Sequence, residues 1–136
     1  MVEINNLTFT PIDEKFFKKL AHNVLKGEGK KNFELSIALV GQKRIRRLNK
    51  QYLGRDYSTD VLSFPGSKEI NFLGEIVICS QEVKKNAERF NLVFKKELAR
   101  VLIHGILHLL GYEHEKSLKQ AGEMREKEDY YFKKMF

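Results

Sequence analysis

Apolar residues recur every three or four positions in several parts of the chain, which is the spacing of a helix with one buried face. The first helix is predicted to begin at Thr10-Pro11, a pair typical of an N-cap and first turn, and to end near Gly27. The others are predicted over residues 43–52, 80–91, 94–110 and 117–136. The 94–110 segment is apolar on nearly every side, so we expect it to be buried in the core.

Shorter segments between these helices have patterns typical of strands. Phe33 to Leu39 alternates apolar and polar residues, which predicts a strand with one buried face. Val2–Ile4 and Val61–Phe64 are predicted as short strands, the second turned by Pro65-Gly66. Ile76–Cys79 is apolar throughout, so this strand is expected to be covered on both faces. Together the elements predict an α+β fold of about four strands and about five helices, with the helices packed on one side of the sheet.

The composition favours an anionic partner and argues against export. A chain of 136 residues is most simply one domain, predicted here over residues 1–136. Its net charge of +7 makes nucleic acid the first candidate partner and an anionic membrane surface the second. No apolar run approaches the roughly 20 residues needed to span a membrane, and the N-terminus lacks the layout of a signal peptide. The single cysteine, Cys79, excludes an internal disulfide, so we expect a cytoplasmic protein with Cys79 in its core.

The predicted 43–52 helix carries the densest group of basic residues in the chain. Ile45, Leu48 and Tyr52 are expected to face inward, with the basic residues on the other faces. These are Lys43, Arg44, Arg46, Arg47 and Lys50, and Arg55 follows after Gly54. Two interpretations stand at this point: a solvated helix face, or a surface that contacts the phosphates of a nucleic acid.

Three of the four histidines lie in one short stretch, HGILHLLGYEH, from His104 to His114. On a helix, His104 and His108 lie one turn apart on the same face, and Gly111 can reverse the chain before His114. Three neutral imidazoles can bind zinc and leave a fourth position open for water or substrate, whereas structural zinc sites are usually closed by four ligands. We therefore predict one Zn²⁺ per chain at these residues. The alternative is that the histidines only satisfy hydrogen bonds of the helix.

The spacing of this stretch resembles the metzincin protease pattern H-E-x-x-H-x-x-G-x-x-H. The three histidines and the glycine match, but Gly105 stands where those proteases have the glutamate that acts as general base. The pattern thus favours metal binding and argues against peptide hydrolysis by the protease mechanism.

Three segments, STDVLSFP, LGEIVIC and HGILHLLGYEH, resemble the YbeY-type endoribonucleases, and the resemblance covers nearly the whole chain. The family's histidine pattern is H-G-x-L-H-L-x-G-Y-D-H, from which this chain departs only at Glu113. The resemblance implies a mixed sheet in a zincin-like fold, related to metal-dependent proteases, with His104, His108 and His114 as zinc ligands. It also implies an endoribonuclease specific for single-stranded RNA. The expected substrate is ribosomal RNA, in small-subunit maturation and ribosome quality control, with the ribosome or ribosome-assembly proteins as partners.

A second departure concerns an arginine that the family usually has directly after the aromatic residue matching Tyr52, and that is held to be important for activity. Leu53 occupies that position here, and Arg55 follows two residues later. A guanidinium can bind two phosphoryl oxygens at once, so Arg55 is the candidate for stabilising charge in the transition state. Glu113 is a candidate for orienting water or a ligand imidazole. Asp60 is a further candidate, whose alternative role is a hydrogen bond at a strand end.

Three functions are therefore compared. The favoured one is a zinc-dependent endoribonuclease acting on ribosomal RNA, in which water or the 2′-hydroxyl attacks the phosphodiester. The second is a metal-dependent hydrolase of peptides or small esters, against which Gly105 and the basic charge argue. The third is a non-catalytic ribosome-assembly factor whose metal holds the fold, against which three ligands and an open position argue.

Overall fold

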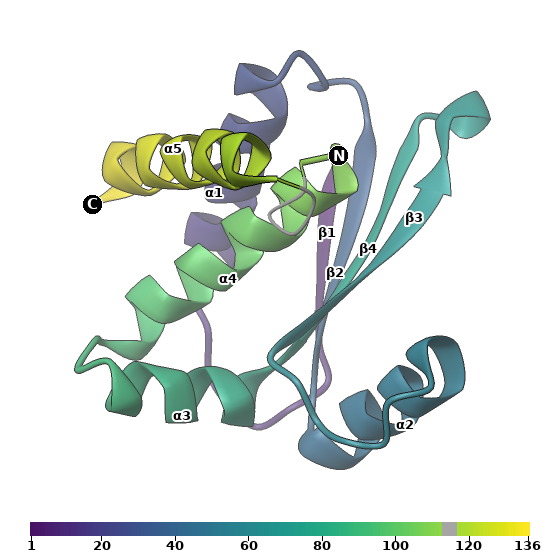
Figure 1. The fold of residues 1–136 in the computed structure, drawn as a ribbon, viewed down its shortest axis with the longest axis vertical. Coiled ribbons are helices and arrows are strands. Elements are labelled where there is room, and N and C mark those ends of the chain that lie inside the picture. The colour runs from purple at the N-terminus through teal and green to yellow at the C-terminus, as the bar shows by residue number, and fades with distance from the viewer. Residues whose placement is uncertain (113–116) are drawn as a thin grey trace.

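Four strands form one mixed sheet in the computed structural model, which describes residues 1–112 and 117–136 (Figure 1). The strands are β1 (Val2–Asn6), β2 (Glu34–Val40), β3 (Val61–Ser67) and β4 (Phe72–Cys79). Their order across the sheet is β1-β2-β4-β3. β2 pairs in parallel with β1 and β4, whereas β3 pairs antiparallel with β4. The predicted mixed α+β fold is confirmed.

Five α-helices surround this sheet in the described part of the chain. They are α1 (Glu14–Gly27), α2 (Gln42–Leu53), α3 (Ser80–Arg89), α4 (Phe94–Leu109) and α5 (Leu118–Met135), and a single 3₁₀ turn, η1 (Lys68–Ile70), joins β3 to β4. Within residues 1–112 and 117–136, none of the helices combines the length and the apolar character that a membrane crossing requires.

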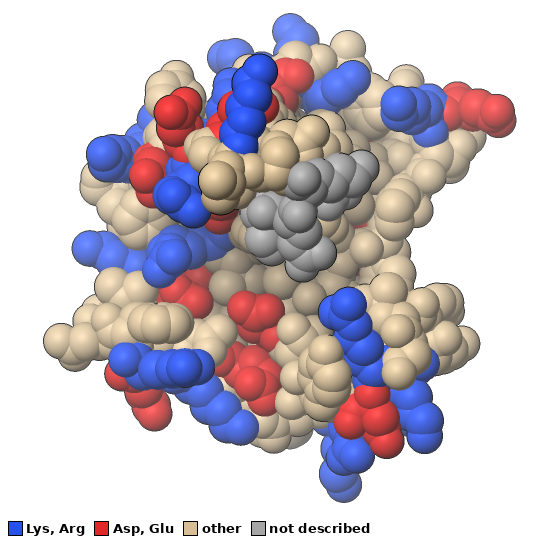
Figure 2. Space-filling view, in the orientation of Figure 1, with Lys and Arg blue, Asp and Glu red and all other residues tan. Residues whose placement is uncertain are grey.

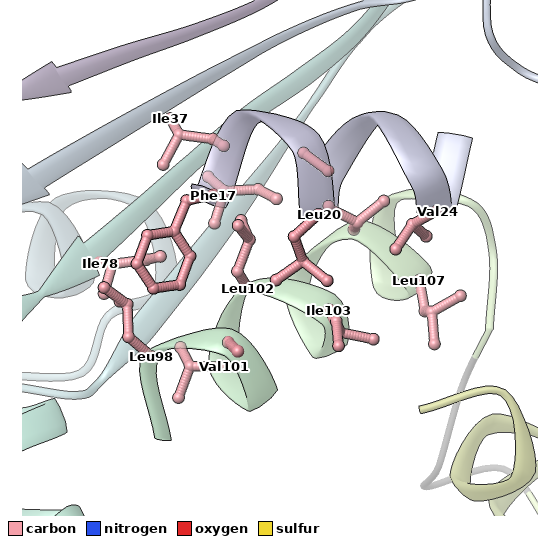
Figure 3. Packing of buried hydrophobic residues seen from close by; sticks show 14 of the residues in the cluster. Phe17, Leu20, Val24, Ile37, Ile78, Leu98, Val101, Leu102, Ile103 and Leu107 are labelled. Atoms are coloured by element: carbon pink, nitrogen blue, oxygen red, sulfur yellow. The ribbon is translucent and has the colours of Figure 1, made fainter. Parts of the chain in front are cut away.

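The two faces of the sheet carry separate apolar clusters of unequal size. The larger cluster packs α1 and α4 against side chains such as Ile37 and Ile78, as Figure 3 shows. The smaller one packs Ile45 of α2 against Val77 and Cys79 on the opposite face. Successive side chains of a strand point to opposite faces, so the apolar run of β4 needs cover on both, as predicted. The prediction that all helices lie on one side is therefore wrong for α2.

Three local predictions are corrected by the structure. The N-cap of α1 is Asp13, not Thr10, because the Asp13 side chain accepts a hydrogen bond from the backbone N–H of Phe16 at 3.1 Å. Tyr52 is 59 % exposed and packs edge-on against Phe64 rather than entering the core. Pro65 and Gly66 continue β3 instead of turning it.

Edge position explains why β3 tolerates proline and glycine. β3 pairs only with β4, so a missing N–H at Pro65 costs no hydrogen bond on its outer side. At Gly66, a Cβ would lie only 2.3 Å from the carbonyl oxygen of Phe72, so no larger residue fits this close approach of the two strands. The turn instead comes at Asn71, whose φ of 53° lies in the left-handed region.

The end of α1, the segment after α4 and helix α5 meet at Glu28. Its carboxylate accepts hydrogen bonds from the hydroxyls of Tyr112 (2.6 Å) and Tyr131, and it pairs with Lys127 at 3.2 Å. Burial raises the pKa of Glu28, but these hydrogen bonds outweigh burial and hold that pKa below its usual value. Hydrogen bonding to Glu28 and burial raise the pKa of Tyr112 to about 12. The Glu28 carboxylate is therefore ionised over a pH range in which the tyrosines remain protonated hydrogen-bond donors.

Replacing Glu28 by glutamine is expected to lower the free energy of unfolding at pH 7 by about 1–3 kcal/mol, because hydrogen bonds to a charged acceptor are weakened. The folded-state pKa lies below the unfolded value of 4.5, so this contribution is complete above pH 4.5 and is lost as the pH falls through the folded pKa. Urea unfolding at pH 7 and at progressively lower pH measures it, with the exposed Glu3→Gln as control. A wild-type advantage that grows on acidification contradicts this assignment.

Candidate functional site

An open groove of about 650 Å³ lies between α2, β3 and α4. Tyr52 and Leu53 from the end of α2 form part of its wall, and His104 and His108 contribute from α4. The loop that joins α2 to β3 supplies the rest of the wall on the α2 side. The groove thus unites segments that are about fifty residues apart in the sequence.

His104 and His108 lie one turn apart near the C-terminal end of α4. Their rings are nearly parallel, at 6°, with centroids 6.3 Å apart. The His108 ring is exposed and the His104 ring is partly buried, whereas the residues between them, Ile106 and Leu107, are fully buried. The apolar side of α4 therefore fixes the helix in the core and leaves both imidazoles on the wall of the groove. The spacing predicted that they share one face of the helix.

The chain leaves α4 through a tight C-terminal turn at Gly111. Its N–H donates to the carbonyl of His108 at 3.1 Å, and the N–H of Tyr112 donates to that of Leu107 at 3.1 Å. Gly111 has a φ of 100°, which a residue with a side chain rarely adopts. The turn that the sequence predicted after His108 is thus present.

The third predicted metal ligand, His114, and the predicted catalytic residue Glu113 lie outside the described residues. Among the residues that the structure describes, there is no group of three or more histidine, cysteine or acidic side chains suited to holding a metal. The structure therefore brings together two of the three predicted ligands, and the metal site stays a prediction.

Gly105, at the position of the protease glutamate, packs closely against the sheet. A Cβ at this position would lie 3.1 Å from Cγ2 of Ile76 and 3.4 Å from Oγ of Ser63. The hydroxyl of Ser63 also donates to the carbonyl of Gly105 at 3.4 Å. This face of α4 is pressed against β3 and β4, so a side chain at position 105 would require Ile76 to shift by a few tenths of an ångström.

A carboxylate that the sequence prediction did not include lies beside His104. Nδ1 of His104 is 3.2 Å from Oε2 of Glu128, which comes from α5. The available signal was the spacing along α5: Glu128 lies one turn after Met124, which is fully buried, and therefore on the inward-facing side of that helix. Histidine ligands of metals usually donate their second ring N–H to a carboxylate, a backbone carbonyl or water.

Further acidic side chains lie near this histidine. Asp60, Glu97 and Glu128 line a smaller hollow next to His104, together with Arg100, which pairs with Glu97 at 3.5 Å. Burial raises the pKa of the Glu97 carboxyl. Asp60 also lines the main groove, and it accepts hydrogen bonds from the Asn86 side chain (3.3 Å) and from the Cys79 N–H to its carbonyl (2.9 Å). The hydrogen-bonding role that was the alternative for Asp60 is therefore observed.

Arg55 is exposed and lines the same groove as the two histidines. Its loop is held by Asn49, which is 1 % exposed: the carbonyl of Asn49 accepts from the Arg55 N–H at 3.3 Å, and its side chain donates to the Tyr57 carbonyl at 2.9 Å. Gly54 ends α2 with a φ of 68° and directs the chain into this loop. Leu53, where the resemblance predicts an arginine, also lines the groove.

The basic residues of α2 lie on its exposed faces. Figure 2 shows lysine and arginine side chains gathered over α2 at the lower right, with acidic atoms among them. All five predicted residues, Lys43, Arg44, Arg46, Arg47 and Lys50, are exposed. Asp56 pairs with Arg46 at 2.9 Å and with Lys50 at 3.9 Å, and the hydrogen bond from Arg46 lowers the pKa of Asp56. Part of this charge is therefore already neutralised within the chain.

Comparisons with known proteins agree on one family. The family profile described as endoribonuclease YbeY matches residues 3–136. Endoribonuclease YbeY from Chlorobium phaeovibrioides is 39 % identical over 132 residues, covering 97 % of this chain and 88 % of that protein. Endoribonuclease YbeY from Thermotoga maritima is 42 % identical over 123 residues, covering 90 % of this chain and 80 % of that protein. The solution structure of TM1509 from Thermotoga maritima matches with a TM-score of 0.71 and 37 % identity, over 99 % of this chain and 89 % of that one.

Proposed function

The chain belongs to the YbeY endoribonuclease family, an RNA-hydrolysing enzyme family, and from this premise we propose a zinc-dependent endoribonuclease that cleaves single-stranded regions of ribosomal RNA. The proposed roles are maturation of the small-subunit RNA and ribosome quality control, with the ribosome or its assembly proteins as partners. The observation that carries the proposal is that Arg55, His104 and His108 line one open groove.

The donor set of the groove fits a zinc ion. His104 and His108 offer imidazole nitrogens from one face of α4, and His104 has a carboxylate on its Nδ1. His114, outside the described residues, is the proposed third ligand, which leaves one position open. When bound, the ion supplies Lewis acidity toward a phosphoryl oxygen and lowers the pKa of a bound water to about 7.

The residues of the groove have complementary roles toward RNA. The Arg55 guanidinium can donate two parallel hydrogen bonds to the oxygens of the scissile phosphate as their charge grows. Tyr52 and Tyr57, which are 59 % and 55 % exposed on the groove wall, offer ring faces on which unpaired bases can stack. Bases of a duplex are already stacked and paired, so this arrangement favours single strands. Glu113 keeps its proposed role of orienting water or a ligand imidazole.

The peptide-hydrolase alternative is not favoured by any observation at the site. Its general base would have to stand at position 105, where this chain has a glycine that packs closely against Ile76 and offers no carboxylate. A deciding experiment incubates purified, metal-quantified protein with ribosomal RNA and with an unstructured peptide, each with and without a chelator. We expect RNA cleavage that the chelator abolishes and zinc restores. Intact RNA with metal-loaded protein would overturn the proposal.

Contact between α2 and RNA phosphates predicts a salt-dependent affinity that individual residues control. Replacing Lys43, Arg44 or Arg47 by alanine is expected to flatten the plot of log affinity against log salt by about 0.7 unit each, the value for single strands. Arg46 and Lys50 are expected to contribute less because Asp56 pairs with both. Binding titrations across a salt series measure the slopes, with Lys19→Ala on α1 as control. Unchanged slopes would mean a solvated helix face.

A further inference from the structure

We infer that Glu128 is a positioning residue that fixes the tautomer and orientation of His104 and thereby sets the metal affinity of the groove. The inference rests on the proposed metal function and adds to it a residue from α5. Oε2 of Glu128 lies 3.2 Å from Nδ1 of His104, and the two side chains are 31 % and 33 % exposed. Both side chains are therefore partly buried.

The turns of α5 before and after Glu128 are both anchored in the protein. It lies against α4, which carries the histidines (Figure 1). Met124, one turn before Glu128, is fully buried, and Tyr131, about one turn after it, is 2 % exposed and donates to Glu28. Because both neighbouring turns are fixed, the backbone of residue 128 cannot shift without disturbing the core. The backbone that carries the Glu128 carboxylate is therefore anchored next to His104.

A carboxylate beside Nδ1 determines the chemistry of the imidazole. A neutral imidazole carries one proton, and the hydrogen bond at one nitrogen decides which nitrogen keeps it. An ionised carboxylate only accepts hydrogen bonds, so Nδ1 of His104 must be the donor. Nε2 is then the nitrogen whose lone pair can bind a metal, and the negative charge of Glu128 makes that lone pair more basic.

Zinc affinity tests the inference without reference to catalysis. Glu128→Ala is expected to raise the dissociation constant for zinc by roughly 10- to 100-fold, the usual effect of removing such a partner. Glu128→Gln keeps an acceptor but loses the charge, so its effect should be intermediate. Competition against a chelating indicator measures both, with Glu126→Gln, an exposed position on the same helix, as the matched control. An unchanged dissociation constant in Glu128→Ala would overturn the inference.

The tautomer of His104 provides a second readout that a purely structural role would not change. In metal-free protein, the ¹⁵N chemical shifts of the imidazole should show the proton on Nδ1 in the wild type and a shift toward Nε2 in Glu128→Ala. If that variant does not fold, the same spectra of Glu128→Leu decide, because leucine offers Nδ1 no acceptor. Equal tautomer populations in wild type and folded variant contradict the inference. His104→Ala distinguishes the two proposals: if zinc affinity survives that change, the metal proposal itself is wrong.

Discussion

His108→Ala is expected to reduce zinc from about one ion per chain to a small fraction and to lower RNA turnover by about 10³-fold. The estimate follows from the several kcal/mol of charge stabilisation that a metal gives to a phosphoryl transition state. The His108 ring is exposed, so its loss removes little buried apolar surface and the fold should persist. Metal analysis after native purification and single-turnover kinetics on a single-stranded RNA measure the two effects.

The fourth histidine of the chain is a natural control for this experiment. His22 is exposed on α1, which packs on the face of the sheet opposite α2, and it does not line the groove. His22→Ala should leave zinc content and turnover unchanged. Retention of one zinc per chain in His108→Ala would mean that the metal is held elsewhere.

Arg55→Ala is expected to lower turnover by roughly 10²–10³-fold, as for other preorganised donors that stabilise developing charge. Arg55→Lys should restore only part of the rate, because lysine keeps the charge but loses the two-pronged geometry. Zinc content should stay at the wild-type level in both variants, since Arg55 is not among the predicted ligands. Kinetics on a single-stranded RNA measure the rates, with the exposed Arg125→Ala on α5 as control.

Leu53 allows a sharper form of the same test. Leu53 and Arg55 line the same groove, and Leu53 stands where the sequence resemblance predicts an arginine. Adding Leu53→Arg to Arg55→Ala should therefore recover turnover if a guanidinium in this groove is what the reaction needs. Near-normal turnover in Arg55→Ala alone would assign the role to another cation.

Local patterns were enough to predict most of the fold. The apolar run of β4 required cover on both faces, and the nearly all-apolar α4 required a central position; both are observed. The ends of helices and strands were harder to predict. Several residues near Thr10 can cap a helix, and only the structure identifies Asp13 as the N-cap. The placement of α2 was also missed, since an amphipathic pattern shows which side is buried but not which face of a sheet covers it.

The candidate site was predictable where its residues are close in sequence. His104 and His108 share one helical turn, and their common direction follows from that spacing alone. Glu128 was missed because its contact with His104 joins two helices that are far apart along the chain. Asn49 was missed because its partner, the Tyr57 carbonyl, comes near only in the folded loop. Their inward-facing positions on α5 and α2 were the only local indication.

The contacts of Glu28 have a consequence for how the molecule opens. One carboxylate joins the end of α1 to Tyr112, just beyond the histidine helix, and to Tyr131 on α5. Because these contacts share an acceptor, detachment of α5 removes support from the segment after α4 at the same time as it withdraws Glu128 from His104. The last 18-residue helix and the histidine end of α4 are therefore expected to open together. A truncation that removes α5 would accordingly also remove Glu128 and Tyr131, and with them the support for the histidine side of the groove.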